Sequence, residues 1–319
     1  MPPIPANIIE PTLAAMNEQI AKKAKREVRR LYLGMSSIGR ECSREQWYNF
    51  RWVGRVEFGA TTLKNFEDGH RTEDLYAERL RSIPGVTLIT ADPVTGRQIG
   101  FSDFGGHYRG HMDGHIEGIL QSPKTPHVWE HKATNTKKFN LLKKLCAELG
   151  EKRALMAWDF TYWAQQISYL DFGGYSRSYL TASTPGGRDD TSVRTDADPK
   201  SASLLRDKAE KIIFSDEPPA KISEKAEYYQ CKWCDWSEYC HQGKAADRNC
   251  RTCMHSTVRR EGGWMCAKYQ ADLNADAQAQ GCSSHRYNPY LVPGEVVDGS
   301  TDENWMEYDI NGTEWRDNG

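Results

Sequence analysis

The sequence has no long apolar run and no segment typical of a secretory signal. A membrane-spanning helix needs about 20 consecutive apolar residues, and no stretch of the chain approaches that length. The first residues, Met1–Pro5, lack the basic segment followed by an apolar one that directs secretion. Only 38% of the residues are hydrophobic and 27% are charged. We therefore expect a soluble, intracellular protein with no membrane partner.

Without a secretion signal, the nine cysteines are not expected to form disulfides. Disulfides are rare in reducing compartments, where clustered cysteines more often bind metal or take part in catalysis. Seven of the nine lie between residues 231 and 282. This clustering predicts metal binding in that part of the chain.

The chain also lacks the overall positive charge that is typical of a protein with a polyanionic partner, because its formal net charge is −2. The acids are concentrated at one end, however. Residues 291–319 carry eight acids against Arg316 alone, which leaves a charge of about +5 on residues 1–290. Two basic clusters suit phosphate backbones, although the first would equally fit a solvated helix face. They are Lys22, Lys23, Lys25, Arg26, Arg29 and Arg30, and Lys132, Lys137, Lys138, Lys143 and Lys144.

Apolar periodicity and turn residues predict an α/β core with a mixed sheet and no internal repeat. We expect helices over residues 8–33, 61–82, 137–149, 151–170 and 199–213, and one through Trp47 and Tyr48 after a capping Ser36-Ser37. We expect several antiparallel strands between residues 85 and 120, one of them carrying Asp113, and further strands at 128–133, 176–183 and 191–195. The predicted divisions are a basic N-terminal helix (1–33), an α/β domain (34–245), a cysteine-rich module (246–292) and an acidic tail (293–319).

Three charged residues near the middle of the chain have the spacing of a metal-dependent phosphodiesterase. Asp113 follows Gly110-His111-Met112, and Glu130-His131-Lys132 comes seventeen residues later. Side chains two apart in a strand point to the same face, so Glu130 and Lys132 would share one surface. Asp113 and Glu130 could bind Mg²⁺ or Mn²⁺, while Lys132 would stabilise or orient an attacking water. Alone, a Glu-x-Lys pair also arises by chance on solvated strands.

Other residues follow in the order of one nuclease family. His70 in Gly-His-x-x-Glu precedes Asp113, and Gln165-x-x-x-Tyr169 follows Lys132. Over roughly residues 34–242, the chain resembles the RecB-type nucleases of the PD-(D/E)XK superfamily, which include AddB-type domains, CRISPR-adaptation nucleases with an iron–sulfur cluster and phage recombination exonucleases. Met112 stands in place of the proline in the superfamily's name. The resemblance implies a restriction-endonuclease-like α/β core, in which a mixed sheet is flanked by helices.

The resemblance also implies roles for single residues. Lys132 would help to activate water, and Gln165 with Tyr169, one helical turn apart, would orient Lys132 or the DNA strand. Without the resemblance, Tyr169 would be an ordinary core aromatic, and either Gln165 or Gln166 could face the site. The implied ligands of Mg²⁺ or Mn²⁺ are His70, Asp113, Glu130 and the main-chain carbonyl of His131.

Four cysteines at the two ends of the nuclease-like region form a first set. Cys42 lies far upstream of Cys231-x2-Cys234-x5-Cys240. One remote and three clustered cysteines are the arrangement of the iron–sulfur members of the family, and four thiolates are the usual complement of a 4Fe–4S cluster. Zinc could use the same sulfurs. The resemblance favours a structural 4Fe–4S cluster that ties the first helix of the nuclease to the last.

A second set follows, and its spacing fits a small structural zinc site. A second iron–sulfur cluster is one alternative, and unligated thiols are another. Cys146 belongs to neither set and is expected to be a buried apolar thiol. The second set consists of Cys250, Cys253, Cys266 and Cys282, with His255 and His285 as substitutes.

The acidic end of the chain also contains aromatic residues, Trp305, Tyr308 and Trp315. It could be a solvated and partly disordered tail. Alternatively, it could mimic DNA and compete for the basic cleft, or bind a partner such as a single-strand annealing or replication protein.

Together, these features predict a metal-dependent DNA exonuclease of recombination, repair or replication, in the cytoplasm of a bacterium or of a phage-infected cell. It would act on single-stranded DNA or duplex ends, and the resemblance favours single strands digested from a free 5′ end. The alternatives are a non-catalytic nucleic-acid-binding protein and a site-specific endonuclease that reads bases through its zinc module. Paired carboxylates favour the first function, because a pure binder does not need them beside phosphate.

Overall fold

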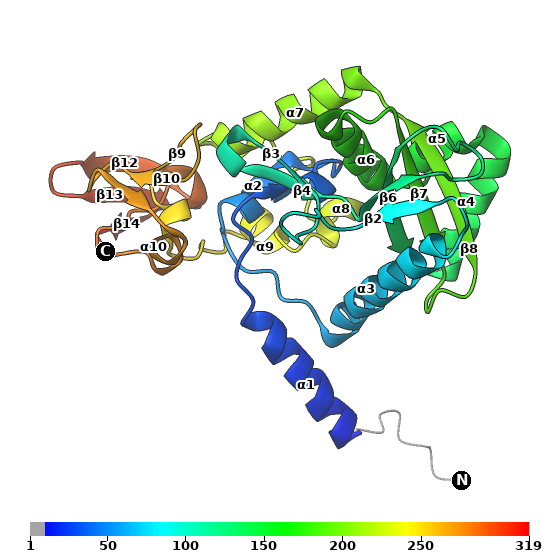
Figure 1. Ribbon diagram of the computed structural model, residues 1–319. Coiled ribbons are helices and arrows are strands. Elements are labelled where there is room, and N and C mark those ends of the chain that lie inside the picture. Colours follow the sequence, from blue (N-terminus) through cyan, green and yellow to red (C-terminus); the bar gives the residue numbers. More distant parts are fainter. Residues whose placement is uncertain (1–9, 319) are drawn as a thin grey trace, which may run out of the picture.

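The computed structural model describes residues 10–318. A large α/β domain, which we call the body, joins a smaller, β-rich lobe (residues 246–318) (Figure 1). One N-terminal helix, α1 (Pro11–Lys25), projects from the body. None of the helices within residues 10–318 has both the length and the apolar character needed to cross a bilayer.

The body is built around a five-stranded sheet with the order β2-β5-β6-β7-β8. Strands β6 and β7 are parallel and every other neighbouring pair is antiparallel, so the predicted mixed sheet is confirmed. Parallel strands need a long crossover, and here it consists of α4 (Thr136–Leu149), α5 (Glu151–Trp158) and α6 (Phe160–Gly173). The strands are β2 (Thr87–Ile89), β5 (Gly114–Glu117), β6 (His127–Ala133), β7 (Arg177–Ser183) and β8 (Asp190–Asp196).

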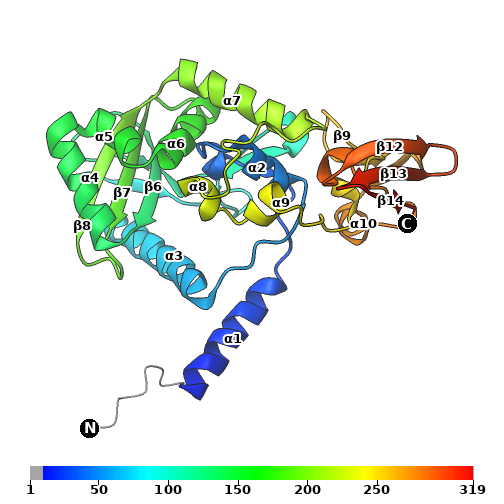
Figure 2. The same ribbon diagram turned by 180° about the vertical axis from the view of Figure 1, so that it is seen from behind.

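Both faces of the central strand β6 are covered. Val128 belongs to the larger hydrophobic cluster, together with residues of α6, while Trp129 belongs to a second cluster with residues of α3 (Ala60–Arg81). Views from the front and from behind show α3 and α6 on either side of the sheet (Figures 1 and 2). Successive residues of β6 thus point to different helices, as the two-residue period of a strand requires.

A smaller three-stranded sheet and several helices complete the body. Its strands, in the order β1-β4-β3, bring the segment after α1 beside the segment before Asp113. The elements are β1 (Leu33–Gly34), β3 (Gly100–Asp103), β4 (Tyr108–His111), the 3-10 helices η1 (Met35–Ser37) and η2 (Phe104–Gly106), and the helices α2 (Ser43–Phe50), α7 (Pro199–Phe214), α8 (Tyr229–Lys232) and α9 (Ser237–His241).

Several boundaries differ from the sequence-based expectations. Helix α1 ends at Lys25 rather than at residue 33, and residues 8 and 9 lie outside the described part of the chain. The Cys42 side chain, not Ser36-Ser37, caps α2, because it accepts a hydrogen bond from Glu45 N. The single helix expected over 151–170 is broken at Asp159, whose carboxylate caps α6 by accepting from Tyr162 N at 3.0 Å.

The lobe contains two further three-stranded antiparallel sheets. The acidic segment forms one of them, so the expectation of a partly disordered tail is wrong. The elements are η3 (Cys250–Thr252), β9 (Ser256–Val258), β10 (Trp264–Cys266), β11 (Ala271–Leu273), α10 (Ala275–Gln280), η4 (Pro289–Leu291), β12 (Glu295–Ser300), β13 (Trp305–Ile310) and β14 (Thr313–Asp317).

Candidate active site

Asp113 and Glu130 lie next to each other on neighbouring segments of the main sheet. Asp113 occupies the short joint between β4 and β5 rather than a strand, which corrects the sequence-based expectation. The following residue, Gly114, pairs with Trp129 of β6. The Asp113 carboxylate is held in place because its Oδ2 accepts a hydrogen bond from His131 N at 2.8 Å.

Glycine before this joint allows close packing beneath the site. A Cβ on Gly110 would lie 2.4 Å from a ring carbon of Tyr169 and 2.8 Å from the sulfur of Met35. Gly110 therefore lets β4 approach α6, and this brings Asp113 towards the helix that carries Gln165 and Tyr169.

Of the two carboxylate oxygens of Glu130, one accepts hydrogen bonds and the other accepts none from the described residues. Its Oε1 accepts hydrogen bonds from Lys132 Nζ at 2.5 Å and from Gln165 Nε2 at 3.0 Å. Its Oε2 is buried and has no hydrogen-bond partner among the described residues. An unsatisfied buried carboxylate oxygen is costly unless another group binds it. A divalent cation bound by oxygen ligands fits this position.

The environment of both carboxyl groups opposes their ionisation. Burial and the nearby Asp113 raise the pKa of Glu130 to about 7. Burial also raises the pKa of Asp113, to about 6, with a further contribution from Glu73 that opposes the effect of Lys132. Carboxylates that repel each other in a buried site are typical of a place where positive charge is bound during function.

Lys132 supplies one positive charge to this site. Burial would lower its pKa, but the carboxylates of Glu130 and Asp113 outweigh burial and raise the pKa above its ordinary value. Lys132 is therefore protonated at neutral pH and acts as a hydrogen-bond donor, not as a base. Its ammonium also lies 5.2 Å from the centre of the Tyr162 ring.

A third carboxylate, that of the half-buried Glu73 on α3, lies near enough to interact electrostatically with Glu130 and Lys132. Burial and the charge of Glu130 raise the pKa of Glu73, while Lys132 lowers it. Glu73 is the last residue of the Gly-His-x-x-Glu motif, but sequence reasoning gave it no role. The signal that could have found it was its position three residues after His70, on the same side of one helix.

The two histidines of the predicted ligand set lie in different surroundings. His70 is exposed on α3, one turn before Glu73, and it has no hydrogen bond to another described side chain. The His131 ring is buried on the opposite face of β6 from Glu130 and stacks on Tyr76, with ring centres 4.3 Å apart. Burial and the charges of Lys132 and Arg79 lower the pKa of His131 to about 3. The ring is therefore a neutral core group, which leaves only the main-chain carbonyl of His131 for the predicted role.

The helix α6 positions Gln165 and Tyr169 beside Glu130. Gln165 Nε2 donates to the Tyr169 hydroxyl at 3.0 Å as well as to Glu130, so the structure brings these residues together as predicted from their spacing. The adjacent Gln166 is fully buried, and neither atom of its amide has a hydrogen-bond partner in the described structure. Gln165 therefore holds the Glu130 carboxylate, and the neighbouring Gln166 amide contributes to lowering the pKa of Glu130, against the larger effect of burial.

The first cysteine set lines one small cavity between α2 and the α8–α9 segment. Cys42, Cys231, Cys234 and Cys240 all border this cavity, which measures about 20 Å³. Burial, followed by neighbours that include Cys42, raises the pKa of Cys234 to about 12. The cavity therefore brings the remote N-terminal cysteine of α2's cap together with the three cysteines near the end of the body.

The second set lines another cavity of about 20 Å³, inside the lobe. Burial and the other three cysteines raise the pKa of Cys250 to about 11. His255 Nε2 lies 2.7 Å from Asn304 Oδ1, whereas the buried Nδ1 of His285, which also borders the cavity, has no hydrogen-bond partner among the described residues. The four sulfurs that line this cavity are Cys250, Cys253, Cys266 and Cys282.

Within residues 10–318, no three His, Cys, Asp or Glu side chains are placed closely enough to form a ready-made metal site. The chemistry of each donor set nevertheless fits a metal. Four thiols around a space of about one water molecule suit a single zinc ion. A 4Fe–4S cluster is larger, so the thiols of the first set would have to move apart to hold it.

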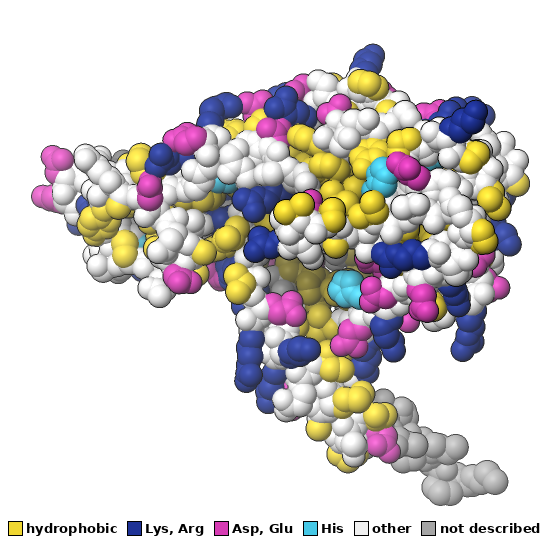
Figure 3. Space-filling model, viewed as in Figure 1, with side chains coloured by type: hydrophobic (Ala, Val, Ile, Leu, Met, Phe, Trp, Pro, Cys, Tyr) yellow, Lys and Arg dark blue, Asp and Glu magenta, His cyan; other side chains and the backbone are white. Residues whose placement is uncertain are grey.

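A cavity of about 690 Å³ lies beside the candidate active site. It separates the segment that follows α1 from the edge of the body formed by α2 and α6, and Tyr162 borders it directly next to Lys132. Figure 3 shows Lys and Arg side chains along α1 and on the underside of the body. Basic and aromatic side chains line the cavity, among them Lys25, Arg29, Arg30, Arg40, Arg55, Trp52, Phe58 and Phe66.

No family model matches the sequence, and no curated protein matches it. Solved structures with a similar arrangement include that of SSO0001, at 14% identity and a TM-score of 0.38, which covers 72% of this chain and 95% of that one. An alkaline exonuclease from Laribacter hongkongensis has 13% identity, a TM-score of 0.39 and coverages of 61% and 90%. A phage related exonuclease from Haemophilus somnus 129PT has 10% identity, a TM-score of 0.37 and coverages of 53% and 77%. These TM-scores are too low to assign the chain to the family of any of them.

Proposed function

We propose that this protein is a nuclease that hydrolyses phosphodiester bonds of DNA with the help of Mg²⁺ or Mn²⁺. One observation carries the proposal: the buried carboxyl groups of Asp113 and Glu130 lie beside Lys132, and Glu130 Oε2 has no hydrogen-bond partner among the described residues. A non-catalytic nucleic-acid-binding protein would not need paired carboxylates at the place where phosphate binds.

The residues divide the chemistry among them. Asp113, Glu130 and the His131 carbonyl would hold the cation, with Glu73 or His70 completing its ligands. When bound, the cation would polarise the phosphodiester and lower the pKa of a water molecule.

Lys132 would place its ammonium beside the reacting phosphate, where it stabilises the charge that develops and orients the water. Gln165 has a positioning role, because its hydrogen bond to Oε1 keeps Glu130 turned so that Oε2 stays free. Tyr169 in turn fixes Gln165.

We further propose that the substrate is single-stranded DNA or a duplex end, digested as by an exonuclease. The cavity beside Tyr162 supports this proposal, since its basic side chains suit a phosphate backbone and its aromatic rings suit unstacked bases. The two cysteine sets would bind a 4Fe–4S cluster (Cys42, Cys231, Cys234, Cys240) and a zinc ion (Cys250, Cys253, Cys266, Cys282), both in structural roles.

DNA cleavage tests the proposal. Purified protein is incubated with Mn²⁺ and end-labelled single-stranded, duplex and circular DNA. We expect metal-dependent loss of linear DNA, no cleavage of circles and no activity in EDTA. Binding of all three substrates without any cleavage would instead establish a non-catalytic binding protein. Discrete internal cuts would establish an endonuclease.

A further inference from the structure

Arg251 belongs to the cysteine-rich lobe, and its side chain is buried where the lobe meets the body. It stands between Cys250 and Cys253 in η3, and it is only 1% exposed. Its guanidinium lies 4.0 Å from the centre of the Trp52 ring and 4.9 Å from that of Trp264. No carboxylate within residues 10–318 forms an ion pair with it. A buried cation without a counter-ion is costly, so its other contacts must compensate.

Hydrogen bonds to main-chain carbonyls compensate for the missing counter-ion of Arg251. Arg251 Nη1 donates to Phe50 O at 2.8 Å, and Nη2 donates to Leu31 O at 3.0 Å. Nε donates to Gln278 Oε1 of α10 at 2.8 Å. One side chain thus joins the end of α2, the segment that follows α1, and the lobe.

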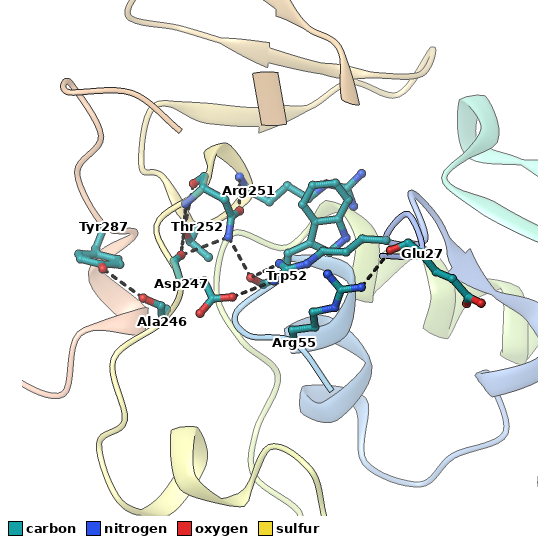
Figure 4. Close-up of polar contacts among 10 residues, drawn as sticks. Glu27, Trp52, Arg55, Ala246, Asp247, Arg251, Thr252 and Tyr287 are labelled. Atoms are coloured by element: carbon teal, nitrogen blue, oxygen red, sulfur yellow. Dashed lines mark hydrogen bonds and ion pairs between the residues drawn. The ribbon is translucent and has the colours of Figure 1, made fainter. Parts of the chain in front are cut away.

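Residues next to Arg251 in the chain also contact the segment that follows α1, directly or through Trp52. Asn249 Nδ2 donates to Trp52 O at 2.9 Å, and Trp52 Nε1 donates to Arg30 O at 3.0 Å. An ion pair of 2.9 Å links Arg29 to Asp247. Figure 4 shows Asp247, Arg251 and Thr252 grouped beside Trp52.

A further hydrogen bond holds the chain at residue 27, just after the end of α1. Arg55 Nη2 donates to Glu27 O at 2.9 Å, as drawn in Figure 4. We call residues 24–31 the arm. Helix α1 has no buried residue. It contacts α3, where Lys64 Nζ donates to Asn17 Oδ1 at 2.7 Å, so the arm is the second attachment that sets its orientation. The arm carries Arg26, Arg29 and Arg30, and together with Ala21 of α1 it borders the cavity that reaches Tyr162.

We infer that Arg251 is a positioning residue that fixes the basic arm and α1 against the body, so that the lobe controls how the cavity holds a nucleic-acid strand. This inference rests on the proposed function. Arg251 itself would not touch the strand, because its guanidinium is buried and engaged with carbonyls. Cys250 and Cys253 flank it, so a disturbance of their site would also release the arm.

The first test measures the arm directly, in the full-length protein and without any catalytic reaction. Trypsin cleaves after Lys and Arg, and the arm contains several such bonds. We expect Arg251→Met to raise the rate of tryptic cleavage at Arg26, Arg29 and Arg30 by about 10-fold or more, because released segments are cut in proportion to their open population. Asp247→Asn, which removes only the exposed ion pair and keeps every positive charge, should give a smaller increase at the same bonds.

Arg51→Met is the matched control. Arg51 is also 1% exposed and lies over the Trp47 and Trp264 rings, but it bonds to Ser215 O and Asp216 instead of the arm. Loss of Arg51 should destabilise the core without selective cleavage in the arm. Equal cleavage in the Arg51 and Arg251 variants, or an unchanged rate in both Arg251→Met and Asp247→Asn, would overturn the inference.

The second test separates the arm from the chemistry. In Arg251→Met, the affinity for a 20-nucleotide single strand should fall about 10-fold, as expected when several phosphate contacts are lost. Hydrolysis of bis(p-nitrophenyl) phosphate, which is too small to reach the arm, should stay unchanged. If the native protein cleaves neither substrate, the proposed function fails, and the tryptic pattern and strand affinity still decide the role of Arg251. Unchanged strand affinity together with a released arm would contradict the role of the arm in binding.

Discussion

In the α/β body, the buried side chains are mainly aliphatic and aromatic, and they form two clusters on the faces of the main sheet. In the lobe, the buried apolar side chains are few, with Val258, Trp264 and Tyr308 as the largest. Buried polar groups outnumber them there, including Asn249, Arg251, Thr252, His285, Arg286, Asn288 and Asn304. Hydrophobic burial can therefore stabilise the body, whereas the lobe depends on hydrogen bonds, on its docking to the body and on whatever its cysteines bind.

Removal of a metal should have the largest effect, and it should affect the two regions differently. A structural zinc ion contributes on the order of 10 kcal/mol to the folding of a small module. Cys253→Ser should therefore abolish zinc binding and expose the lobe to proteases, while the body stays folded.

The reciprocal change is Cys42→Ser. Protein purified without oxygen should contain about four irons, and this variant should lose iron but keep zinc. Zinc in both sets and no iron would refute the 4Fe–4S assignment. Loss of both metals in either variant would show that the two sites are not independent.

The next effect concerns buried charge in the body. Glu130→Gln should lower DNA cleavage by about 10³-fold or more, because it removes a ligand of the cation. The melting temperature of the metal-free protein should stay the same or rise, since a neutral amide replaces a carboxyl group whose ionisation is opposed. Glu117→Gln, an exposed position on β5, serves as the control and should change neither quantity. Normal cleavage by Glu130→Gln would refute the assigned site.

The docking of the lobe predicts an intermediate effect. Trp264 lies on β10 of the lobe but is 1% exposed and belongs to the main cluster of the body. Trp264→Ala should lower the free energy of unfolding of the whole protein by about 3 kcal/mol.

Trp233→Ala, at a position that is 81% exposed, is the matched control and should change the free energy of unfolding by less than about 0.5 kcal/mol. Denaturant titrations followed by tryptophan fluorescence would compare the two. Equal values would show that the lobe folds independently of the body.

The smallest predicted effect is a pH dependence. The pKa of Asp113 is raised to about 6 and that of Glu130 to about 7 in the folded protein. Between about pH 4 and 7 the metal-free folded state therefore binds more protons than the unfolded state, so its stability falls as pH rises through this range. The effect should disappear in Asp113→Asn/Glu130→Gln and should shrink when Mn²⁺ is added. Melting temperatures at pH 5 and pH 8 measure it, and a higher value at pH 8 would contradict the prediction.

The same contrast explains what the sequence could predict. The strand over 128–133 and the helix over 61–82 were predicted almost to their ends. In both segments the spacing of apolar residues indicates the type of secondary structure. The shared face of Glu130 and Lys132 followed from the two-residue period of the strand. The grouping of the cysteines into two sets also followed from their spacing, since each set lines one cavity.

The parts that were not predicted depend on contacts between distant residues. Glu73 lies near the site because α3 packs against β6, and its spacing from His70 gives only its side of the helix, not this packing. Arg251 links the lobe to Phe50 O and Leu31 O through hydrogen bonds, although these residues are about 200 positions away in the chain. The acidic segment forms a sheet although its charge suggested a solvated tail. Tyr308 and Asp317 are buried, and Asp317 accepts a hydrogen bond from Tyr287 N, while most of the other acids are exposed.

The sheet of the acidic segment has two open edges, and this affects how the protein behaves in concentrated solution. Strand β12 lies at one edge and exposes Val296 and Val297, which would allow another chain to pair with it. The register shifts between Val296 and Asp298, and Glu295 flanks the valines on the other side. The irregular edge and its carboxylates oppose such pairing at neutral pH. Acidification below about pH 4, which neutralises the carboxylates, would therefore favour aggregation that begins at this strand.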